Sequence, residues 1–283
     1  KDIIHENTKQ LSTQQEGKWA LLSSLLPLSI AKQLMNDDRK LIAQTYKDVT
    51  VLFTDIKGFT NFSRSITPRK LVEFLNNMYS AFDDVLMDWE AYKVEILGDA
   101  YFVVCGCPEE RSPTENAARA TEVALILQSL MPSLTDNTGM MMRVGLHSGS
   151  VVAGVVGRKD PRFHLFGHTV LFANKMESHG MPGKVHASEA TFNRLTPLIH
   201  DKKFDVEARG EIEVQGEEGL HKTYFINKSN WGREQKRSRL LKQQTERNIS
   251  KTKKARQSMN LGNMNRIELS SAVLKEANAA NSK

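Results

Sequence analysis

Hydrophobic and polar residues repeat with two different periods between positions 49 and 105. Residues 49–55 and 92–99 are rich in β-branched and aromatic side chains and end on an aspartate close to a glycine, as strands that enter a turn often do. A strand, a helix and a strand returning beside the first would place Asp55 and Asp99 at one end of a sheet. Residues 68–89 predict that helix, with one apolar face: Leu71, Phe74, Leu75, Met78, Phe82, Val85 and Leu86.

The remaining pattern predicts a second long helix and further strands. Residues 101–105 continue as a strand after a hairpin turn at Gly98-Asp99, and residues 114–131 have helical spacing. With a strand at 140–146, the order βαββαβ predicts an α+β fold with a ferredoxin-like sandwich core. Beyond it we expect strands at 151–156, 184–187, 204–214 and 221–226, and helices at 170–178 and 189–195.

Both ends of the chain differ from this central part. Residues 1–39 predict helix with a weak heptad pattern that favours a coiled coil, and Pro27 is expected to kink or restart it. Residues 228–283 contain 14 Lys/Arg and 4 Glu, a net charge of +10, which leaves −4 for the rest of a chain whose total is +6. This composition predicts a largely disordered basic tail. It is either solvated without a specific partner or in contact with acidic lipid, nucleic acid or an acidic protein.

Composition also indicates the cellular context. The chain starts on Lys1 without a signal peptide, so we expect it to be part of a longer protein. No run of eighteen apolar residues predicts a membrane span. Cys105 and Cys107 are one residue apart, a poor spacing for a disulfide. We therefore expect a reducing, cytoplasmic location, with the cytoplasmic part of a membrane protein as an alternative.

The two aspartates suggest a metal site. Asp55 precedes a Gly58-Phe59-Thr60 segment that is expected to form a turn with free backbone N–H groups. Two carboxylates beside such a turn suit Mg²⁺ that carries a triphosphate. The alternative is that each aspartate only caps its turn, which is the more common role for one aspartate but not for this pair.

Three segments resemble the successive motifs of class III nucleotide cyclase catalytic domains, most closely the guanylyl branch. They are Phe53-Thr54-Asp55-Ile56-x-Gly58-Phe59-Thr60, Lys93-Val94-Glu95-x-x-Gly98-Asp99-Ala100-Tyr101 and Arg143-Val144-Gly145-Leu146-His147-Ser148-Gly149. The resemblance covers roughly residues 25–227. It implies a coiled-coil and signalling linker helix at 1–45, a nucleotide cyclase catalytic domain at 46–227 and the basic tail at 228–283, with an upstream sensor domain before them.

The resemblance implies that GTP is converted to cyclic GMP and pyrophosphate at a dimer interface. Asp55 and Asp99 would hold two Mg²⁺ (or Mn²⁺), with the Ile56 carbonyl as a further ligand, and Arg143 would pair with the β- and γ-phosphates. The backbone N–H groups of Gly58, Phe59 and Thr60 would bind phosphate.

The other half of the family's site departs from the family pattern at three positions. Leu171 stands where an Asn is usual, Lys175 where an Arg is usual, and Gln215 where a Lys is usual. Leucine cannot bind a ribose oxygen, and lysine lacks the planar fork of arginine. We therefore predict the metal-donating subunit of a heterodimer, whose partner supplies the Asn, Arg and Lys. The Asn174-Lys175 pair resembles the α-type subunits of soluble guanylyl cyclases.

The base-reading positions by resemblance are Glu95 and His164. A glutamate is typical of guanylyl cyclases, and a histidine can donate to the guanine O6. If the partner reads the base, both residues line an idle cleft, and the choice between GTP and ATP stays open.

Three other functions remain open at this point. A homodimeric guanylyl or adenylyl cyclase with weak activity would use Lys175 in place of arginine. A regulatory pseudo-cyclase would bind nucleotide without turnover. Specific nucleic-acid binding is disfavoured because the predicted sheet lacks paired aromatic positions for base stacking.

Overall fold

The structure is a computed structural model that describes residues 15–23, 25–36, 41–135, 139–157 and 161–232. The predictions for residues 1–14, where the heptad pattern begins, lie outside the described residues, as do those for the basic tail from residue 233 on. Residues 15–23 are helical. The helices that follow are α2 (Leu28–Asn36), α3 (Phe59–Ser65), α4 (Pro68–Trp89), α5 (Pro113–Leu134), α6 (His168–Ser178) and α7 (Glu189–His200). The strands are β1 (Ala43–Lys57), β2 (Tyr92–Leu97), β3 (Ala100–Cys105), β4 (Met141–Val156), β5 (Arg162–Phe166), β6 (Val185–Ser188), β7 (Phe204–Glu213) and β8 (Leu220–Ser229).

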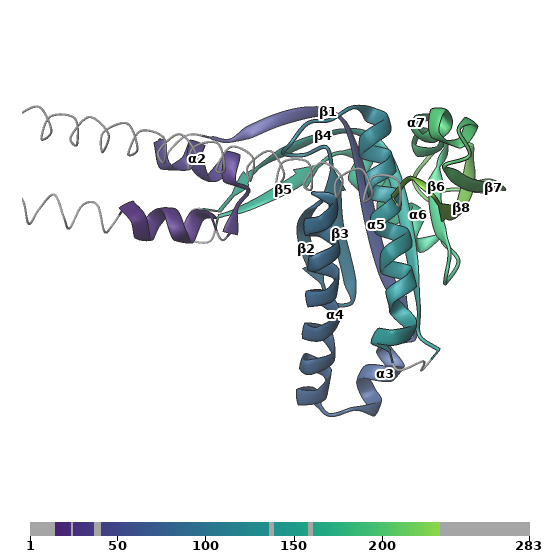
Figure 1. The fold of residues 1–283 in the computed structure, drawn as a ribbon, viewed down its shortest axis with the longest axis horizontal. Helices are drawn as coiled ribbons and strands as arrows, with labels where there is room; N and C mark the ends of the chain where they lie inside the picture. The colour runs from purple at the N-terminus through teal and green to yellow at the C-terminus, as the bar shows by residue number, and fades with distance from the viewer. Residues whose placement is uncertain (1–14, 24, 37–40, 136–138, 158–160, 233–283) are drawn as a thin grey trace, which may run out of the picture. The chain divides into compact units, whose positions relative to one another are not determined.

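The strands form one sheet in the order β2-β3-β1-β4-β6-β8-β7, and β5 pairs with β4. β1 is antiparallel to both β3 and β4, and β2 and β3 form a hairpin. Together with α4 and α5, these four strands make the βαββαβ unit, so the predicted ferredoxin-like α+β core is confirmed. In Figure 1, α4 and α5 run alongside these strands, while β6, β7 and β8 extend the sheet at the other edge.

α4 spans the residues that its apolar stripe predicts. Its first turn is capped by the Thr67 hydroxyl, which accepts a hydrogen bond from the Lys70 N–H at 3.4 Å, and Pro68 occupies the first helical position, where no N–H is needed. Met78, Phe82 and Leu86 are buried against the sheet. α5, predicted at 114–131, starts in the same way from Ser112, whose hydroxyl accepts from the Glu115 N–H.

The other face of the sheet is covered by α6 and by the N-terminal helix. α6 approaches β4 so closely that a Cβ on Gly145 would lie 2.0 Å from the Glu177 backbone nitrogen. Ile30 and Leu34 of α2 are buried on the same face. α2 begins after Pro27, whose carbonyl accepts from the Ala31 N–H at 2.8 Å, so the helix restarts there as expected. Leu22 and Leu26 are buried in the same cluster, and the coiled coil stays a prediction.

Two local predictions were wrong, and one strand was missed. The strands expected at 140–146 and 151–156 form a single strand, β4, because the buried Ser148 hydroxyl is satisfied across the sheet by the Thr50 hydroxyl at 2.8 Å. The expected turn at Gly58-Phe59-Thr60 starts α3: Gly58 adopts φ +92° and its carbonyl accepts from the Phe62 N–H. β5 was not predicted.

The remaining elements agree with expectation in type, although β1 starts six residues before the predicted strand and α7 continues five residues beyond its predicted end. Cys105 and Cys107 are buried and unpaired, as expected. Within the described part of the chain, no helix combines the length and hydropathy needed to cross a bilayer.

Candidate active site

Asp55 and Asp99 lie together beyond the end of the β1–β3 ladder. Thr54 pairs with Tyr101 at its last position, so the two aspartates follow on neighbouring segments. Burial raises the pKa of Asp99 above its usual range, and the charge of Asp55 raises it further, although the backbone N–H groups of Asp99 and Ile56 act in the opposite direction. Two carboxylates this close repel each other, and a bound cation would relieve that repulsion.

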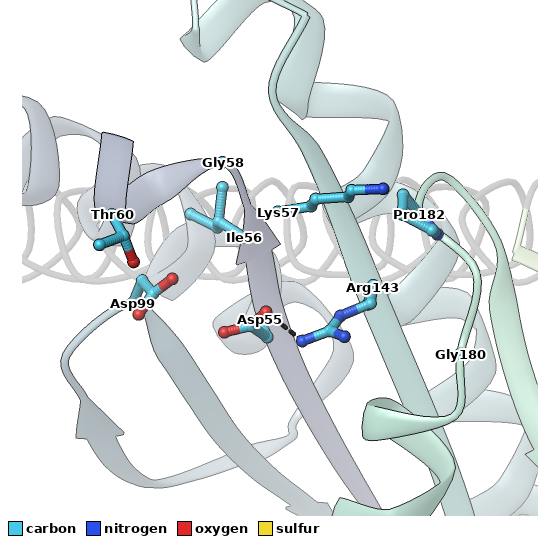
Figure 2. A pocket seen from close by; sticks show the side chains of 9 residues that line it. All are labelled: Asp55, Ile56, Lys57, Gly58, Thr60, Asp99, Arg143, Gly180 and Pro182. Atoms are coloured by element: carbon cyan, nitrogen blue, oxygen red, sulfur yellow. Dashed lines mark hydrogen bonds and ion pairs between the residues drawn. The ribbon is translucent and has the colours of Figure 1, made fainter. Parts of the chain in front are cut away.

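Both aspartates line an open cavity of about 430 Å³. Figure 2 shows Asp99 and Asp55 side by side, with Thr60 next to Asp99 and Arg143 on the far side of Asp55. Of the seven residues predicted to bind metal or phosphate, six line this cavity: Asp55, Ile56, Gly58, Thr60, Asp99 and Arg143. The seventh, Phe59, packs its ring against the core and offers only its backbone.

The available ligands fit a hard divalent cation. Carboxylate and carbonyl oxygens are the ligands that Mg²⁺ prefers, usually one or two carboxylates together with water and substrate phosphate. The described residues contain no group of three or more His, Cys, Asp or Glu that would enclose a metal ion. The pair Asp55 and Asp99 therefore suits a cation that arrives with a phosphorylated substrate.

Arg143 reaches the cavity from β4. It stands directly opposite Asp55 in the β1–β4 register, and its Nη2 donates to Asp55 Oδ2 at 2.5 Å. Its Nε lies 2.9 Å from the Oε1 of Glu177 on α6. The arginine predicted to bind phosphate is thus held between two carboxylates.

Three residues near the aspartates were not predicted. Lys57 lines the same cavity and reaches toward Pro182 in Figure 2. Its position two residues after Asp55 on one strand could have revealed it, because alternate residues share a face. The Tyr79 hydroxyl donates to the Gly98 carbonyl at 2.7 Å and so anchors the turn that presents Asp99. The contacts of Tyr79 and Glu177 join segments far apart in sequence, and no local pattern marks them.

The three degenerate positions lie elsewhere, on α6 and the β7–β8 hairpin. Leu171 exposes 65% of its surface, although it is apolar. Lys175 donates from Nζ to Gln215 Oε1 at 3.4 Å, so the structure brings two of the three together. None of them is among the residues that line the cavity of Asp55 and Asp99. Gln215 instead lines a second cavity of about 540 Å³ along the hairpin.

Glu95 on β2 and His164 on β5 also meet. The His164 Nδ1 lies 4.0 Å from Glu95 Oε2, and both side chains are about 70% buried. Neither lines the cavity of the aspartates. The two residues predicted to read the base therefore contact each other at a place separate from the cavity of the aspartates.

Comparison with known proteins identifies the family. Residues 41–228 match the model of the adenylate and guanylate cyclase catalytic domain. The chain belongs to this family.

The most similar relatives include guanylate cyclases of two kinds. The chain is 39% identical to the receptor-type guanylate cyclase gcy-28 of Caenorhabditis elegans over 79% of its length, and 40% identical to the guanylate cyclase soluble subunit beta-2 of Rattus norvegicus over 80%. It spans only 17% and 32% of the length of these two proteins.

A solved structure supports the same assignment. The guanylate cyclase domain of RhGC from Catenaria anguillulae, crystallised in complex with GTP, is 34% identical. It superposes with a TM-score of 0.60 over 66% of this chain and 100% of that one. The predicted family and fold are therefore confirmed. The three similar proteins named here are all guanylate cyclases or parts of one.

Proposed function

We propose that this chain is the metal-donating subunit of a heterodimeric guanylyl cyclase, which converts GTP to cyclic GMP and pyrophosphate. One observation carries the proposal. The metal and phosphate residues share one cavity, whereas Leu171, Lys175 and Gln215, on another surface, lack the groups that the family uses there. This proposal keeps the division into a linker helix at 1–45, a catalytic domain at 46–227 and a tail at 228–283.

The residues of the cavity have distinct roles in this mechanism. Asp55 and Asp99 would hold the cations, with the Ile56 carbonyl as a further ligand. Arg143 neutralises charge on the β- and γ-phosphates as the ribose 3′-oxygen attacks the α-phosphorus and pyrophosphate leaves. The amides of Gly58, Phe59 and Thr60 bind phosphate at the start of α3. Two Mg²⁺ or Mn²⁺ ions, when bound, would make the 3′-hydroxyl more acidic and offset phosphate charge.

The partner subunit supplies what α6 and the hairpin lack. Leu171 offers no hydrogen bond to a ribose oxygen, and Lys175 shares its amino group with Gln215. A lysine is also a point charge that does not reproduce the bidentate geometry of arginine on a phosphoryl group. A partner with Asn, Arg and Lys at the matching positions would complete one productive site.

In this arrangement, Glu95 and His164 face the unproductive cleft. The partner then selects the base, and GTP is the expected substrate because the similar fungal domain was crystallised with GTP. We further propose a sensor domain upstream and a cytoplasmic location, in a soluble protein or on the inner side of a membrane protein. Contact of the basic tail with acidic lipid stays a prediction.

The test compares the purified chain alone with the chain mixed with a cyclase domain that carries the Asn, Arg and Lys half. We expect little cyclic nucleotide from the chain alone and cyclic GMP after mixing, with Mg²⁺ or Mn²⁺ and GTP preferred over ATP. Full activity of the homodimer would contradict the heterodimer proposal. Inactivity of both samples would favour a regulatory pseudo-cyclase if a known metal-donating subunit activates the same partner.

A weakly active homodimer is the second candidate, because Lys175 still places a cation on α6. In that case Lys175→Ala abolishes the residual activity of the purified chain. An unchanged residual rate would count against this candidate.

A further inference from the structure

Glu177 is a buried carboxylate that the proposed mechanism does not use. It leaves α6 at the point where that helix touches β4, above Gly145, and its side chain is only 9% exposed. Burial raises the pKa of Glu177 above its usual range, and the charge of Arg143 acts in the opposite direction. Glu177 is therefore held beside the arginine of the cavity but does not line the cavity itself.

The contact between Glu177 and Arg143 is close but poorly aligned. The Nε and Oε1 atoms are 2.9 Å apart, yet neither atom has a hydrogen-bond partner, so the attraction here is mainly Coulombic. The Nη2 of the same guanidinium is instead aligned on Asp55. Arg143 thus bonds to the carboxylate that the mechanism assigns to the cation, and Glu177 is a second carboxylate in contact with the same guanidinium.

We propose that Glu177 is a positioning residue, which keeps Arg143 directed into the cavity when the Asp55 carboxylate binds a cation. This inference rests on the proposed function. Once Asp55 no longer accepts from Arg143, the guanidinium turns to align its Nε–H with Glu177. That leaves the two Nη groups, the planar fork that suits phosphate oxygens, directed into the cavity. Without Glu177, the arginine must be ordered by the phosphate itself.

Gly145 is part of this arrangement. Any side chain there would collide with the α6 backbone, since an added Cβ would lie 2.6 Å from the Ala173 carbonyl oxygen and 2.0 Å from the Glu177 nitrogen. Because Gly145 has no side chain, α6 packs close enough to β4 for Glu177 to reach Arg143. Arg143 lies two residues before Gly145 on the same face of β4. The helix that bears Lys175 therefore also supports the cavity of Asp55 and Asp99.

Glu177 could affect anion binding in two ways, by positioning Arg143 or simply by its negative charge. The two explanations predict opposite changes in affinity when Glu177 is removed. Glu177 is negative and close to the cavity, so if it acted only through its charge, its removal would strengthen the binding of an anion. If it positions Arg143, its removal weakens anion binding although one negative charge has been lost. The sign of the change in affinity is the decisive result.

The experiment measures binding of inorganic tripolyphosphate to the full chain at saturating Mg²⁺ by isothermal titration calorimetry. This probe has no base and no ribose, so it requires neither turnover nor the partner subunit. We expect Glu177→Gln to weaken binding about ten-fold, the lower end of the range for residues that orient a ligand-binding side chain. Glu115→Gln is the matched control, because Glu115 pairs with Arg119 at 2.7 Å on α5, and it should leave the affinity unchanged.

A double-mutant cycle tests whether Glu177 acts through Arg143. Arg143→Met should weaken tripolyphosphate binding, and adding Glu177→Gln should weaken it no further. If Glu177→Gln fails to fold alone, the double variant removes the arginine and its paired carboxylate together. Arg143→Lys then serves as a second background, because it keeps the charge without the Nε, and adding Glu177→Gln to it should cause no further loss.

Each outcome has a distinct meaning. Wild-type protein that does not bind Mg²⁺ and tripolyphosphate would overturn the proposed metal and phosphate half-site itself. Wild-type binding with equal or tighter binding by Glu177→Gln would overturn the positioning role and leave the proposed function intact. A further loss from Glu177→Gln in the Arg143→Met background would also overturn it, because the effect would not pass through the arginine.

Discussion

The cavity of Asp55 and Asp99 and the surface formed by α6 and the β7–β8 hairpin are built very differently. At the cavity, Arg143 lies between two carboxylates from other segments, Asp55 on β1 and Glu177 on α6. On the other surface, Leu171 is 65% exposed and Lys175 Nζ donates to the neutral amide of Gln215 at 3.4 Å, while His168 on α6 contacts Glu217 of the hairpin at 2.7 Å. A site that must hold concentrated charge needs such counter-charges in place before the ligand arrives. The difference favours one competent half-site in this chain.

Removing the metal aspartates should have the largest effect. With the partner present, Asp55→Asn or Asp99→Asn should lower cyclic GMP formation by about a thousand-fold, because cation stabilisation is worth several kcal/mol in the transition state. The exposed Asp84 on α4 supplies the control, and Asp84→Asn should leave the rate unchanged. Normal activity of the mixture after Asp55→Asn would instead favour a regulatory pseudo-cyclase.

Repairing the other surface should have the next largest effect. The triple variant Leu171→Asn, Lys175→Arg, Gln215→Lys should raise the activity of the chain without a partner by about a hundred-fold, since a single transition-state donor is worth that much. Adding Asp55→Asn to the triple variant should abolish the gain. If the repaired chain stays inactive while the wild-type chain works with its partner, the two halves differ in more than these three residues.

Acid should weaken the junction where α6 meets the sheet. His186 on β6 is fully buried and contacts the Met176 carbonyl on α6 through Nδ1 at 2.7 Å. Burial lowers its pKa to about 4, and Arg209 and His179 also lower it, although the bond to Met176 acts in the opposite direction. The unfolded chain therefore binds more protons than the folded chain between the ordinary pKa and about 4.

The stabilising contribution of neutral His186 is fully present above pH 6.5 and is lost as the pH falls toward 4. We expect the wild-type chain to lose about 2 kcal/mol of unfolding free energy from this group between pH 6.5 and 4.5. His186→Gln should flatten the pH dependence of urea unfolding by that amount, whereas His200→Gln, at an exposed position, should not. Equal slopes for all three proteins would refute this contribution.

The smallest effect concerns Tyr79, whose hydroxyl anchors the turn that presents Asp99. Tyr79→Phe removes the hydrogen bond to Gly98 and should cost about 1 kcal/mol of stability. It should also weaken Mn²⁺ binding, measured by electron paramagnetic resonance, by about five-fold, because a hydrogen bond of about that energy orients the Asp99 turn. Tyr46→Phe, at a buried position beside Cys107, should leave Mn²⁺ affinity unchanged. Equal Mn²⁺ affinity in Tyr79→Phe and wild-type protein would contradict the anchoring role.

Several elements were predictable because their signals are local. α4 matches its predicted range at both ends, since its apolar stripe, the Thr67 cap and Pro68 agree. The β2–β3 hairpin followed from two strand-like runs on either side of Gly98-Asp99. By contrast, the polar residues 147–150 suggested an interruption of β4, and only their pairing with β1 keeps them in the strand.

From the amino-acid sequence we could predict the βαββαβ order, the family and the meeting of Asp55 and Asp99 at one end of the sheet. These follow from the period of apolar residues and from motifs within single strands and turns. Three contacts became apparent only in the folded structure: Arg143 lies between Asp55 and Glu177, Tyr79 anchors the Asp99 turn, and Lys175 contacts Gln215. Such contacts depend on how closely α6 and α4 pack on the sheet, and packing distance is a property of surfaces that meet only after the chain has folded.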